Sequence, residues 1–495
     1  MRDQLTRRRL IQAGGAAAAG AGLLGAGCDS DDDASGKEPA QRRPAPPGAM
    51  NVVVVVMDSL RVDHVYGPRA RTPSIDKVAQ EGLRFTRAYP EGMPTIPARR
   101  AIMAGRRTFP FRGWHPYRDL PPQPGWEPVG SDGKTWTEAL REQGWTTGYI
   151  TDNPHLLLRV HKRFRRTFDR VELVDGQVPL RRKPRRTVSR AEVARNLPPA
   201  LRGSRAEPRM AAYLAANPRD RSEEEFLAAR VFRNGMNWIE WANTRQPFAL
   251  VIDSFDAHEP WDAPRRIKDF YGPASASLEP IQPFPTPAAK YRSLDLTQGI
   301  LRRMRQLYAA EVTLVDAWLG HFLDRLANLG LAENTLVVLL SDHGVLLGEY
   351  GWVGKRYTEI HEELSHVPFV IRHPEGKAAG RASRYYASTH DVGPTVLAAL
   401  GREIPERMNG VDLTPLLDGR QPGRRRPYRT TCYNDHVAAS DGRWLLISDN
   451  QGRDKRLYAM SNESANVAAR YPQHVRRLWG YVKRDAGPGG LPDFK

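Results

Sequence analysis

Two hydrophobic runs of the sequence each end in side chains that could bind a metal ion. Residues 51–57 contain five consecutive valines, typical of a parallel strand buried on both faces, and Asp58 follows them. Residues 335–340 form a second such run, shortly before Asp342 and His343. Carboxylate oxygens and an imidazole nitrogen suit Mn²⁺, Mg²⁺, Ca²⁺ or Zn²⁺. Any one of these residues alone is also typical of a turn or cap, so the metal hypothesis depends on their joint occurrence.

A threonine and an arginine stand at the start of a predicted helix. Thr95 and Arg99 flank Pro97, and Pro94 precedes them, which indicates a turn leading into a helix. The free N–H groups of a helix N-terminus favour negative charge, so a hydroxyl there would face an anion. A metal-activated threonine oxygen could attack phosphorus or sulfur, while Arg99 could stabilise the anionic group. The same string is also compatible with a helix cap and a salt-bridged arginine.

The elements that must position these residues alternate between strands and helices. Further strand-like runs occupy 248–253 and 367–371, and amphipathic helical patterns occupy 74–82, 135–143, 225–244 and 301–329. This alternation predicts an α/β/α sandwich with a mostly parallel central sheet. Open sheets of this kind bind ligands at the carboxyl ends of their strands, where Asp58 and Asp342 are expected.

Additional short motifs occur in a fixed order along the chain. They are Arg61, Thr72-Pro73-Ser74-Ile75-Asp76, Glu81-Gly82-Leu83-Arg84-Phe85, Gly105 after the Thr95 string, His258-Glu259-Pro260, Gly354-Lys355-Arg356-Tyr357, Asp391-Val392-Gly393-Pro394-Thr395 and residues 410–417. Together with the strand ends, these pieces resemble the sulfatase family of the alkaline phosphatase superfamily from about residue 51 onward.

The resemblance implies a hydrolase with one divalent metal ion and a small C-terminal α+β subdomain. The metal would be surrounded by Asp58, Asp342, His343 and Thr95. The transferred group would be held or protonated by Arg99, His258 and Lys355. The expected substrate is an anionic ester.

The nucleophile position departs from the family pattern. Sulfatases of this family convert a Cys or Ser into formylglycine, whose hydrate attacks sulfur, whereas Thr95 stands at that position here. Thr95 would have to act as an alkoxide, as in the phosphoesterases of the superfamily that carry threonine. We therefore expect a phosphate or phosphonate ester ahead of a sulfate ester.

The metal positions depart from the pattern as well. The usual Asp-Asp pair is Asp58-Ser59 here, and His343 replaces the Asn of calcium-dependent sulfatases, which favours Mn²⁺ or Zn²⁺ over Ca²⁺ or Mg²⁺. Of the family's Gly-Lys-x-His stretch only His155 is matched, and we include it as a catalytic candidate. A two-metal site would need residues such as Asp253, Asp256 and His390, whose spacing fits poorly.

The N-terminal region has the features of an export signal. Residues 1–28 combine paired arginines with a short Ala/Gly-rich stretch and resemble a twin-arginine signal, and Cys28 ends a string similar to a lipobox, although Gly25 replaces its usual Leu. We expect an exported protein, either secreted or held at the cell surface by a lipid on Cys28. Ordinary cleavage near Ala26 is the alternative.

The rest of the chain divides into a linker and two folded regions. Residues 29–50 are charged and Pro-rich and are expected to form a tether. Residues 51–375 are assigned to the catalytic domain, and 376–495 to the end of the catalytic fold and the C-terminal subdomain, with strands near 443–447 and 456–458 and a helix near 471–484. Residues 169–220 have no clear family counterpart. They could contribute to substrate specificity, but we expect a partly ordered Arg-rich insertion.

Charge and cysteine content limit the possible partners. Lys plus Arg number 74 and Asp plus Glu 56, giving a net charge of +18 that favours anionic partners. The arginines are spread along the chain with few aromatics beside the densest run, residues 159–186, so no nucleic-acid arm is expected. Two cysteines cannot form a disulfide framework, and Cys432 is expected to be inert packing. No pattern predicts an oligomeric state.

Two functions remain open from the sequence. The first is an exported ester hydrolase that uses Thr95 as nucleophile. The second is a catalytically silent cell-surface protein that keeps the fold and binds anionic polymers.

Overall fold

The structure is a computed structural model of the chain. It describes residues 44–177, 184–273, 278–282, 288–423 and 426–494. The predicted signal, Cys28, most of the predicted tether and residues 178–183 of the Arg-rich region lie outside the described residues. None of the helices in the described part of the chain is long and apolar enough to cross a membrane.

The central element is an eight-stranded sheet in the order β13-β2-β12-β9-β1-β7-β5-β6. Its strands are β1 (Asn51–Met57), β2 (Leu83–Phe85), β5 (Thr146–Thr151), β6 (Arg170–Leu173), β7 (Phe248–Ser254), β9 (Thr335–Ser341), β12 (Phe369–Arg372) and β13 (Arg381–Ser383). Neighbouring strands pair in parallel, except that β12 is antiparallel to both β9 and β2. The predicted mostly parallel sheet is confirmed.

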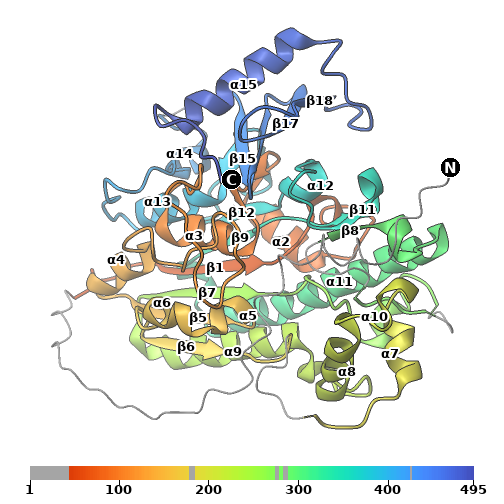
Figure 1. Cartoon of the computed structure of the whole chain (residues 1–495). Helices are drawn as coiled ribbons and strands as arrows, with labels where there is room; N and C mark the ends of the chain where they lie inside the picture. The colour runs from red at the N-terminus through yellow and green to blue at the C-terminus, as the bar shows by residue number, and fades with distance from the viewer. Residues whose placement is uncertain (1–43, 178–183, 274–277, 283–287, 424–425, 495) are drawn as a thin grey trace, which may run out of the picture.

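Helices cover both faces of this sheet, as the alternation predicts (Figure 1). Val53 and Val55 of β1 pack into one core, with α2 (Pro73–Glu81), α9 (Leu227–Ala242) and α11 (Gln298–Asn328). Val52 and Val54 pack into the other, with α3 (Thr95–Ala104), α4 (Trp136–Glu142) and α13 (Val392–Ala399). A strand exposes alternate side chains to opposite faces, so five valines in a row serve both cores, each stabilising the fold by roughly 1.5–3 kcal/mol.

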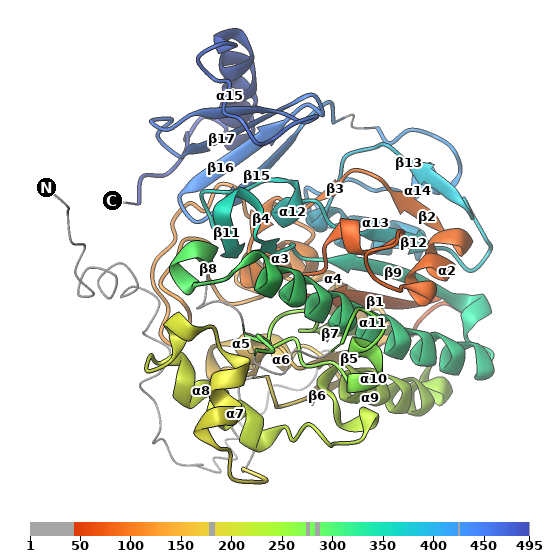
Figure 2. The ribbon, with the colours of Figure 1, turned by 90° about the vertical axis from the view of Figure 1, so that its right-hand side faces the viewer.

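A second sheet forms most of the C-terminal subdomain. Its order is β18-β17-β16-β15-β4, from β4 (Gly92–Met93), β15 (Arg429–Tyr433), β16 (His436–Ser440), β17 (Trp444–Asp449) and β18 (Arg456–Ala459). Helix α15 (Pro472–Ala486) packs on it through Leu478 and Val482, above the main body in Figure 2. One strand, β4, comes from the segment just before Thr95, so the subdomain is joined to the catalytic helix by backbone pairing.

Shorter elements surround the two sheets. A three-stranded sheet in the order β10-β11-β8 consists of β10 (Leu346–Leu347), β11 (Trp352–Gly354) and β8 (Ala288–Lys290), with α12 (Glu362–Ser365) following. The remaining elements are β3 (Ala88–Tyr89), β14 (Ala387–Ser388), α5 (Pro154–Leu157), α6 (Lys162–Arg165), α7 (Arg190–Asn196), α8 (Ala206–Ala216), α10 (Arg265–Lys268) and α14 (Thr414–Leu417).

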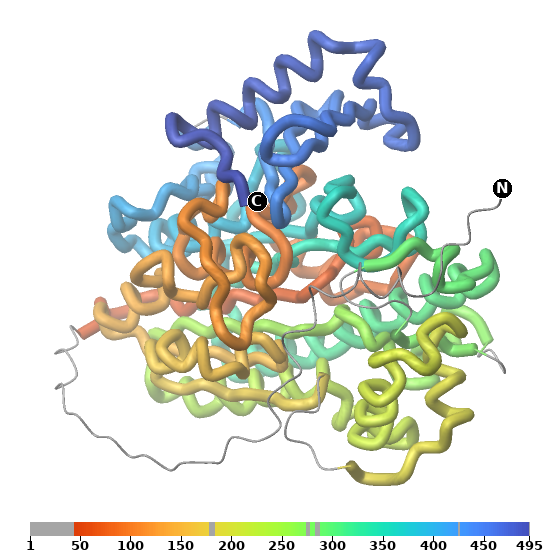
Figure 3. Tube along the Cα trace, viewed as in Figure 1, coloured from red at the N-terminus to blue at the C-terminus, as the bar shows by residue number. Residues whose placement is uncertain are grey.

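Two regions differ in detail from their sequence descriptions. The Arg-rich insertion contains α7 and α8, and Met210, Tyr213 and Leu214 of α8 are buried in the core shared with α9 and α11. The last residues of the chain lie over the segment that follows α3 in Figure 3, where the rings of Phe494 and Trp114 are 6.2 Å apart. The first region buries aromatic and aliphatic groups of α8, and the second packs a partly exposed aromatic pair, neither of which the polar composition reveals.

Candidate active site

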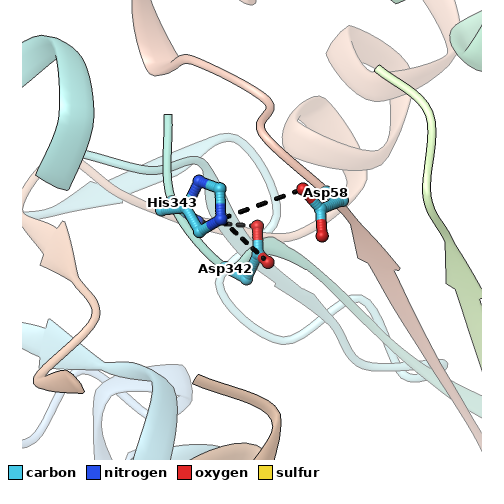
Figure 4. A group of neighbouring side chains, drawn as sticks. All are labelled: Asp58, Asp342 and His343. Atoms are coloured by element: carbon cyan, nitrogen blue, oxygen red, sulfur yellow. Dashed lines mark hydrogen bonds and ion pairs between the residues drawn. The ribbon is translucent and has the colours of Figure 1, made fainter. Parts of the chain in front are cut away.

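Three fully buried side chains form the centre of the site at the carboxyl ends of β1 and β9. Asp58 follows β1, and Asp342 and His343 follow β9, so parallel pairing of these strands brings the three together (Figure 4). Nε2 of His343 lies 3.5 Å from Oδ2 of Asp342 and 3.8 Å from Oδ1 of Asp58. Among the described residues, this is the one group of three or more His, Cys, Asp or Glu side chains whose possible ligand atoms all lie within 4.8 Å of one another.

The protonation state of His343 follows from its other ring nitrogen. Nδ1 lies 2.8 Å from the carbonyl oxygen of Gly344, which can only accept, so Nδ1 carries the proton. Burial lowers the pKa of His343 to about 4, and the ring is therefore neutral near pH 7. Nε2 is left with a lone pair directed toward the two carboxylates, in the arrangement that histidine metal ligands adopt.

These residues fit a divalent cation. Oδ2 of Asp58 is buried and accepts no hydrogen bond, although Nη1 of Arg99 lies 3.1 Å away. Burial and the charge of Asp342 raise the pKa of Asp58 well above its usual range in spite of Arg99. One arginine therefore does not compensate the two adjacent buried carboxylates and the imidazole lone pair, and a further positive charge between them would. The donor set of two oxygens and one nitrogen is also one that Mn²⁺ and Zn²⁺ accept.

Thr95 lies beside this group, at the first turn of α3. Its side chain is 3% exposed, and its Oγ1 lies 3.4 Å from Nε2 of His343. The helix begins here because Pro97 fits its first turn, and it ends at Gly105, whose φ of +59° is favourable for glycine. The structure thus brings Thr95 together with Asp58, Asp342 and His343.

Arg99 lies in the same site and is held there by carboxylates, while its predicted role toward the transferred group stays a prediction. Its Nε and Nη2 donate to the carboxylate of Asp253 at 2.8 and 2.6 Å, and its Nη1 donates to Oδ2 of Asp342 at 2.5 Å. Nη1 also lies 3.1 Å from Oδ2 of Asp58. The sequence predicted that Arg99 stabilises the transferred group. In the structure its positive charge is directed at three carboxylates, two of them in the metal group, because no carboxylate so deeply buried can remain uncompensated.

Asp253 lies in the site, although the sequence does not indicate its role as a partner of Arg99. It lies near the end of β7, fully buried, and accepts a 2.6 Å hydrogen bond from the hydroxyl of Tyr149 in addition to its ion pair with Arg99. Its position at a strand end, like that of Asp58, was the available signal. It was considered only as a ligand for a second metal.

His258 and Lys355 form a pair. Nζ of Lys355 lies 2.6 Å from Nε2 of His258, and Nδ1 of His258 lies 2.8 Å from the carbonyl oxygen of Glu259. Since a carbonyl only accepts, Nδ1 carries the proton and Nε2 accepts from the Lys355 ammonium. Burial and the charge of Lys355 lower the pKa of His258 well below its usual range. Lys355, only 4% exposed, is therefore the proton donor of the pair.

Two neighbouring side chains, Glu259 and Phe255, contact the His258–Lys355 pair. The carboxylate of Glu259 lies 3.3 Å from Nδ1 of His258 and 4.0 Å from Nζ of Lys355, so it offsets the buried ammonium charge. The ring of Phe255 stacks on His258 with centroids 4.1 Å apart. Neither was identified from the sequence, because a glutamate and a phenylalanine within a motif carry no signal of their own.

His155 lies on the same side of the site. Its ring meets Trp126 at 4.9 Å and Phe255 at 6.5 Å between centroids. Burial, with the charges of His161, Arg99 and Lys355, lowers the pKa of His155 to about 3, so the ring is a neutral polar group near the His258 pair.

The other residues weighed for metal binding have separate roles. Ser59, which replaces an aspartate of the family pattern, donates from Oγ to Oδ1 of Asp58 at 2.8 Å and from its backbone to Oδ1 of Asp342 at 3.1 Å. Asp256 accepts from the backbone of Ala228, and Arg426 donates to His390. Neither Asp256 nor His390 belongs to the metal group.

Comparison with known proteins agrees with this geometry. Residues 50–402 match the family described as Sulfatase. The chain is 26% identical to the ulvan-active sulfatase of Formosa agariphila over 76% of this chain, and the match spans 66% of that protein, just under two thirds of its length.

Solved structures share the fold. A protein solved in complex with its substrate D-glucosamine-2-N,6-O-disulfate superposes with a TM-score of 0.66 at 19% identity, covering 88% of this chain and 97% of that one. The phosphonate monoester hydrolase of Agrobacterium radiobacter superposes with a TM-score of 0.64 at 20% identity, covering 88% and 96%. The chain belongs to the sulfatase family, a family of ester hydrolases within the alkaline phosphatase superfamily.

Proposed function

We propose that this protein is a metal-dependent hydrolase of anionic phosphate, phosphonate or sulfate esters, with Thr95 as nucleophile. The observation that carries the proposal is the convergence of a buried hydroxyl, a metal-type ligand group and a buried ammonium. Oγ1 of Thr95 lies 3.4 Å from Nε2 of His343, and the Lys355–His258 pair approaches the same strand edge. A nucleophile, a charge-binding centre and an acid are what ester transfer requires.

Charge supports the need for one divalent cation. When ionised, Asp58, Asp253 and Asp342 carry three negative charges against the one positive charge of Arg99, which contacts all three, while Glu259 offsets Lys355. This excess of negative charge repels an anionic ester, and a divalent ion cancels it. Asp58, Asp342, His343 and Thr95 would hold the ion, for which Mn²⁺ or Zn²⁺ fits the donor set better than Ca²⁺ or Mg²⁺. When bound it supplies Lewis acidity toward the surrounding oxygen atoms.

The chain's own residues then account for both halves of the reaction. In the first, the Thr95 hydroxyl gives up its proton to solvent, a bond forms between its Oγ1 and the phosphorus or sulfur atom, the bond to the leaving oxygen breaks, and that oxygen takes a proton from Lys355. In the second, water forms a bond to the same atom and the bond to Oγ1 of Thr95 breaks. One proton of that water passes to Oγ1, and Lys355 takes up a proton from solvent. His258 directs the ammonium, and burial of the pair excludes bulk water.

We propose phosphorus ahead of sulfur as the reacting atom. A threonine side chain carries a methyl group where formylglycine formation needs a Cys or Ser, so Thr95 reacts as a hydroxyl. The relatives include an ulvan-active sulfatase and a multifunctional alkaline phosphatase superfamily protein of Trinickia caryophylli, 23% identical over 75% of this chain. The experiment therefore includes both phosphorus esters and a sulfate ester.

The experiment is turnover of an aryl phosphodiester, an aryl phosphonate and an aryl sulfate by the purified chain with Mn²⁺. Thr95→Ala is expected to lower kcat by at least about 1000-fold, whereas Thr95→Ser, which keeps the hydroxyl, retains a large part of it. Equal activity of wild type and Thr95→Ala would refute the nucleophile. Anion binding without turnover would support the silent binding protein instead.

We further propose export through the N-terminal signal, with lipidation at Cys28. Paired arginines before a short apolar stretch support it. Replacing Arg7 and Arg8 by Lys should retain the protein inside the cell, whereas Cys28→Ala should release an exported protein from the membrane fraction. Unchanged fractionation of both variants would exclude this route.

A further inference from the structure

A stacked arginine lies directly beside the proton donor. The Arg356 guanidinium lies 4.6 Å from the ring centroid of Trp352 and 4.7 Å from that of Tyr357. Trp352 belongs to β11 and pairs with Lys290 of β8, whose Nζ lies 5.8 Å from the same Trp352 ring. Arg356, Trp352 and Tyr357 are partly exposed, and Lys290 is exposed. Two cations are thus held at a surface by aromatic rings rather than by acids.

Arg356 is joined through the backbone to the residue that donates the proton. Arg356 follows Lys355 in the chain, so their Cα atoms are about 3.8 Å apart. Lys355 Nζ reaches Nε2 of His258, where the leaving oxygen is expected. Lys355 is buried and Arg356 is partly exposed, so an anion that reaches Arg356 approaches from the surface side of this segment.

Among the described residues, no carboxylate neutralises the charge of Arg356. Its Nε donates to Oγ1 of Thr358 at 3.1 Å, and no carboxylate of the described residues forms an ion pair with its guanidinium. Arg99 and Arg426 show the opposite pattern, since each is bonded to a buried carboxylate, and Arg429 is bonded to a partly buried one. Stacking occupies the flat faces of a guanidinium and leaves its in-plane N–H groups, which bind carboxylate, sulfate or phosphate in pairs.

We propose that Arg356, assisted by Lys290, binds a second anionic group on the leaving-group side of the substrate. The substrate class is then a doubly anionic ester, one in which the esterified group reacts at Thr95 and another acidic group is recognised at Arg356. This rests on the proposed function for the identity of the reacting end, but the second position is a binding site that can be measured without turnover.

The experiment uses the full Mn²⁺-loaded protein and two probes that differ by one anionic group, glucose 6-phosphate and glucose 1,6-bisphosphate. Wild type should bind and turn over the bisphosphate better. Arg356→Gln should weaken binding and kcat/KM of the bisphosphate by about tenfold or more and change those of the monophosphate less than about twofold, because a charge-assisted pair is lost only with the former. Lys290→Gln, on an exposed strand edge, should act in the same direction with a smaller effect.

The matched control is Arg245→Gln. Arg245 also stacks on a tryptophan, Trp241, at 4.6 Å, but precedes β7 and so lies at the opposite edge of the sheet. Arg245→Gln should leave the binding and kcat/KM of both probes unchanged.

The outcomes separate the two proposals. Equal effects of Arg356→Gln on both probes, or none on either, would overturn the second anion position and leave a packing role. Calorimetric binding of the bisphosphate that depends on Arg356 in a protein without turnover would support the position while overturning the proposed hydrolysis.

Discussion

The hydroxyl of Tyr433 donates a 3.1 Å hydrogen bond to the backbone carbonyl of Lys355. Tyr433 also pairs, as part of β15, with Met93 of β4, two residues before Thr95. One fully buried residue of the C-terminal subdomain thus contacts both the segment carrying the nucleophile and the residue that donates the proton. The subdomain, distant from Thr95 in sequence, helps to fix the spacing of the catalytic groups.

Removing only this hydroxyl should affect proton donation. Tyr433→Phe is expected to lower kcat about fivefold or more on an ester with a poor leaving group and much less on a nitrophenyl ester, which needs little protonation. KM should change little. Tyr428→Phe, which loses a bond to Asp485 in the same subdomain, serves as control. A uniform loss on both esters would indicate a general folding defect rather than misplacement of Lys355.

Arg99 should depend on Asp253 for its orientation. Tyr149→Phe removes one donor to the Asp253 carboxylate, and Asp253→Asn removes half of the charge pair. We expect Asp253→Asn to destabilise the fold by about 3–5 kcal/mol, since it leaves a buried arginine without its main partner, and Tyr149→Phe by about 1 kcal/mol. Urea unfolding measures both. A neutral Asp253→Asn would show that the other carboxylates satisfy Arg99 alone.

Metal removal should lower stability as well as activity. A ligand present at 100 times its dissociation constant adds about 2.7 kcal/mol to the free energy of unfolding. We therefore expect a chelator to lower Tm by several degrees and Mn²⁺ or Zn²⁺ to restore it. His343→Ala should abolish this response, whereas His321→Ala, away from the metal group, should retain it. If neither the chelator nor the added metal changes Tm, the metal site is contradicted.

The segment around α12 should be acid-sensitive. Burial alone would raise the pKa of Glu362, but Arg429, 2.7 Å away, and the hydrogen bonds of His366 and Tyr89 outweigh it and lower the pKa to about 2. A depressed folded pKa stabilises the protein above the unfolded value of about 4.5, and this stabilisation, at most about 3 kcal/mol, is lost as pH falls toward 2.

Replacing Glu362 tests this window. Glu362→Gln should lower the free energy of unfolding at pH 7 and reduce its decline between pH 5 and pH 3. The exposed Glu375→Gln is the control and should leave that decline as in wild type. An undiminished decline in Glu362→Gln would assign the acid sensitivity to other carboxylates.

The sequence by itself determined the layers of the fold and the residues at the ends of its strands. Five consecutive valines can be satisfied only by a strand buried on both faces, so Asp58 had to emerge at a sheet edge, and the same holds for Asp342. The order of the motifs was enough to identify the family, because each motif is local in sequence.

Tertiary structure alone decided how these charges are used. The sequence predicts that Arg99 holds the transferred group, but it does not reveal the three carboxylates from different strand ends that orient Arg99, because pairing between residues as far apart as 99 and 342 is not encoded by any local pattern. The two-residue β4 was equally invisible, because so short a strand exists only through its bonds to β15. Burial makes such pairings obligatory: a charge or backbone group removed from water must find a partner in space, and only the folded chain determines which one.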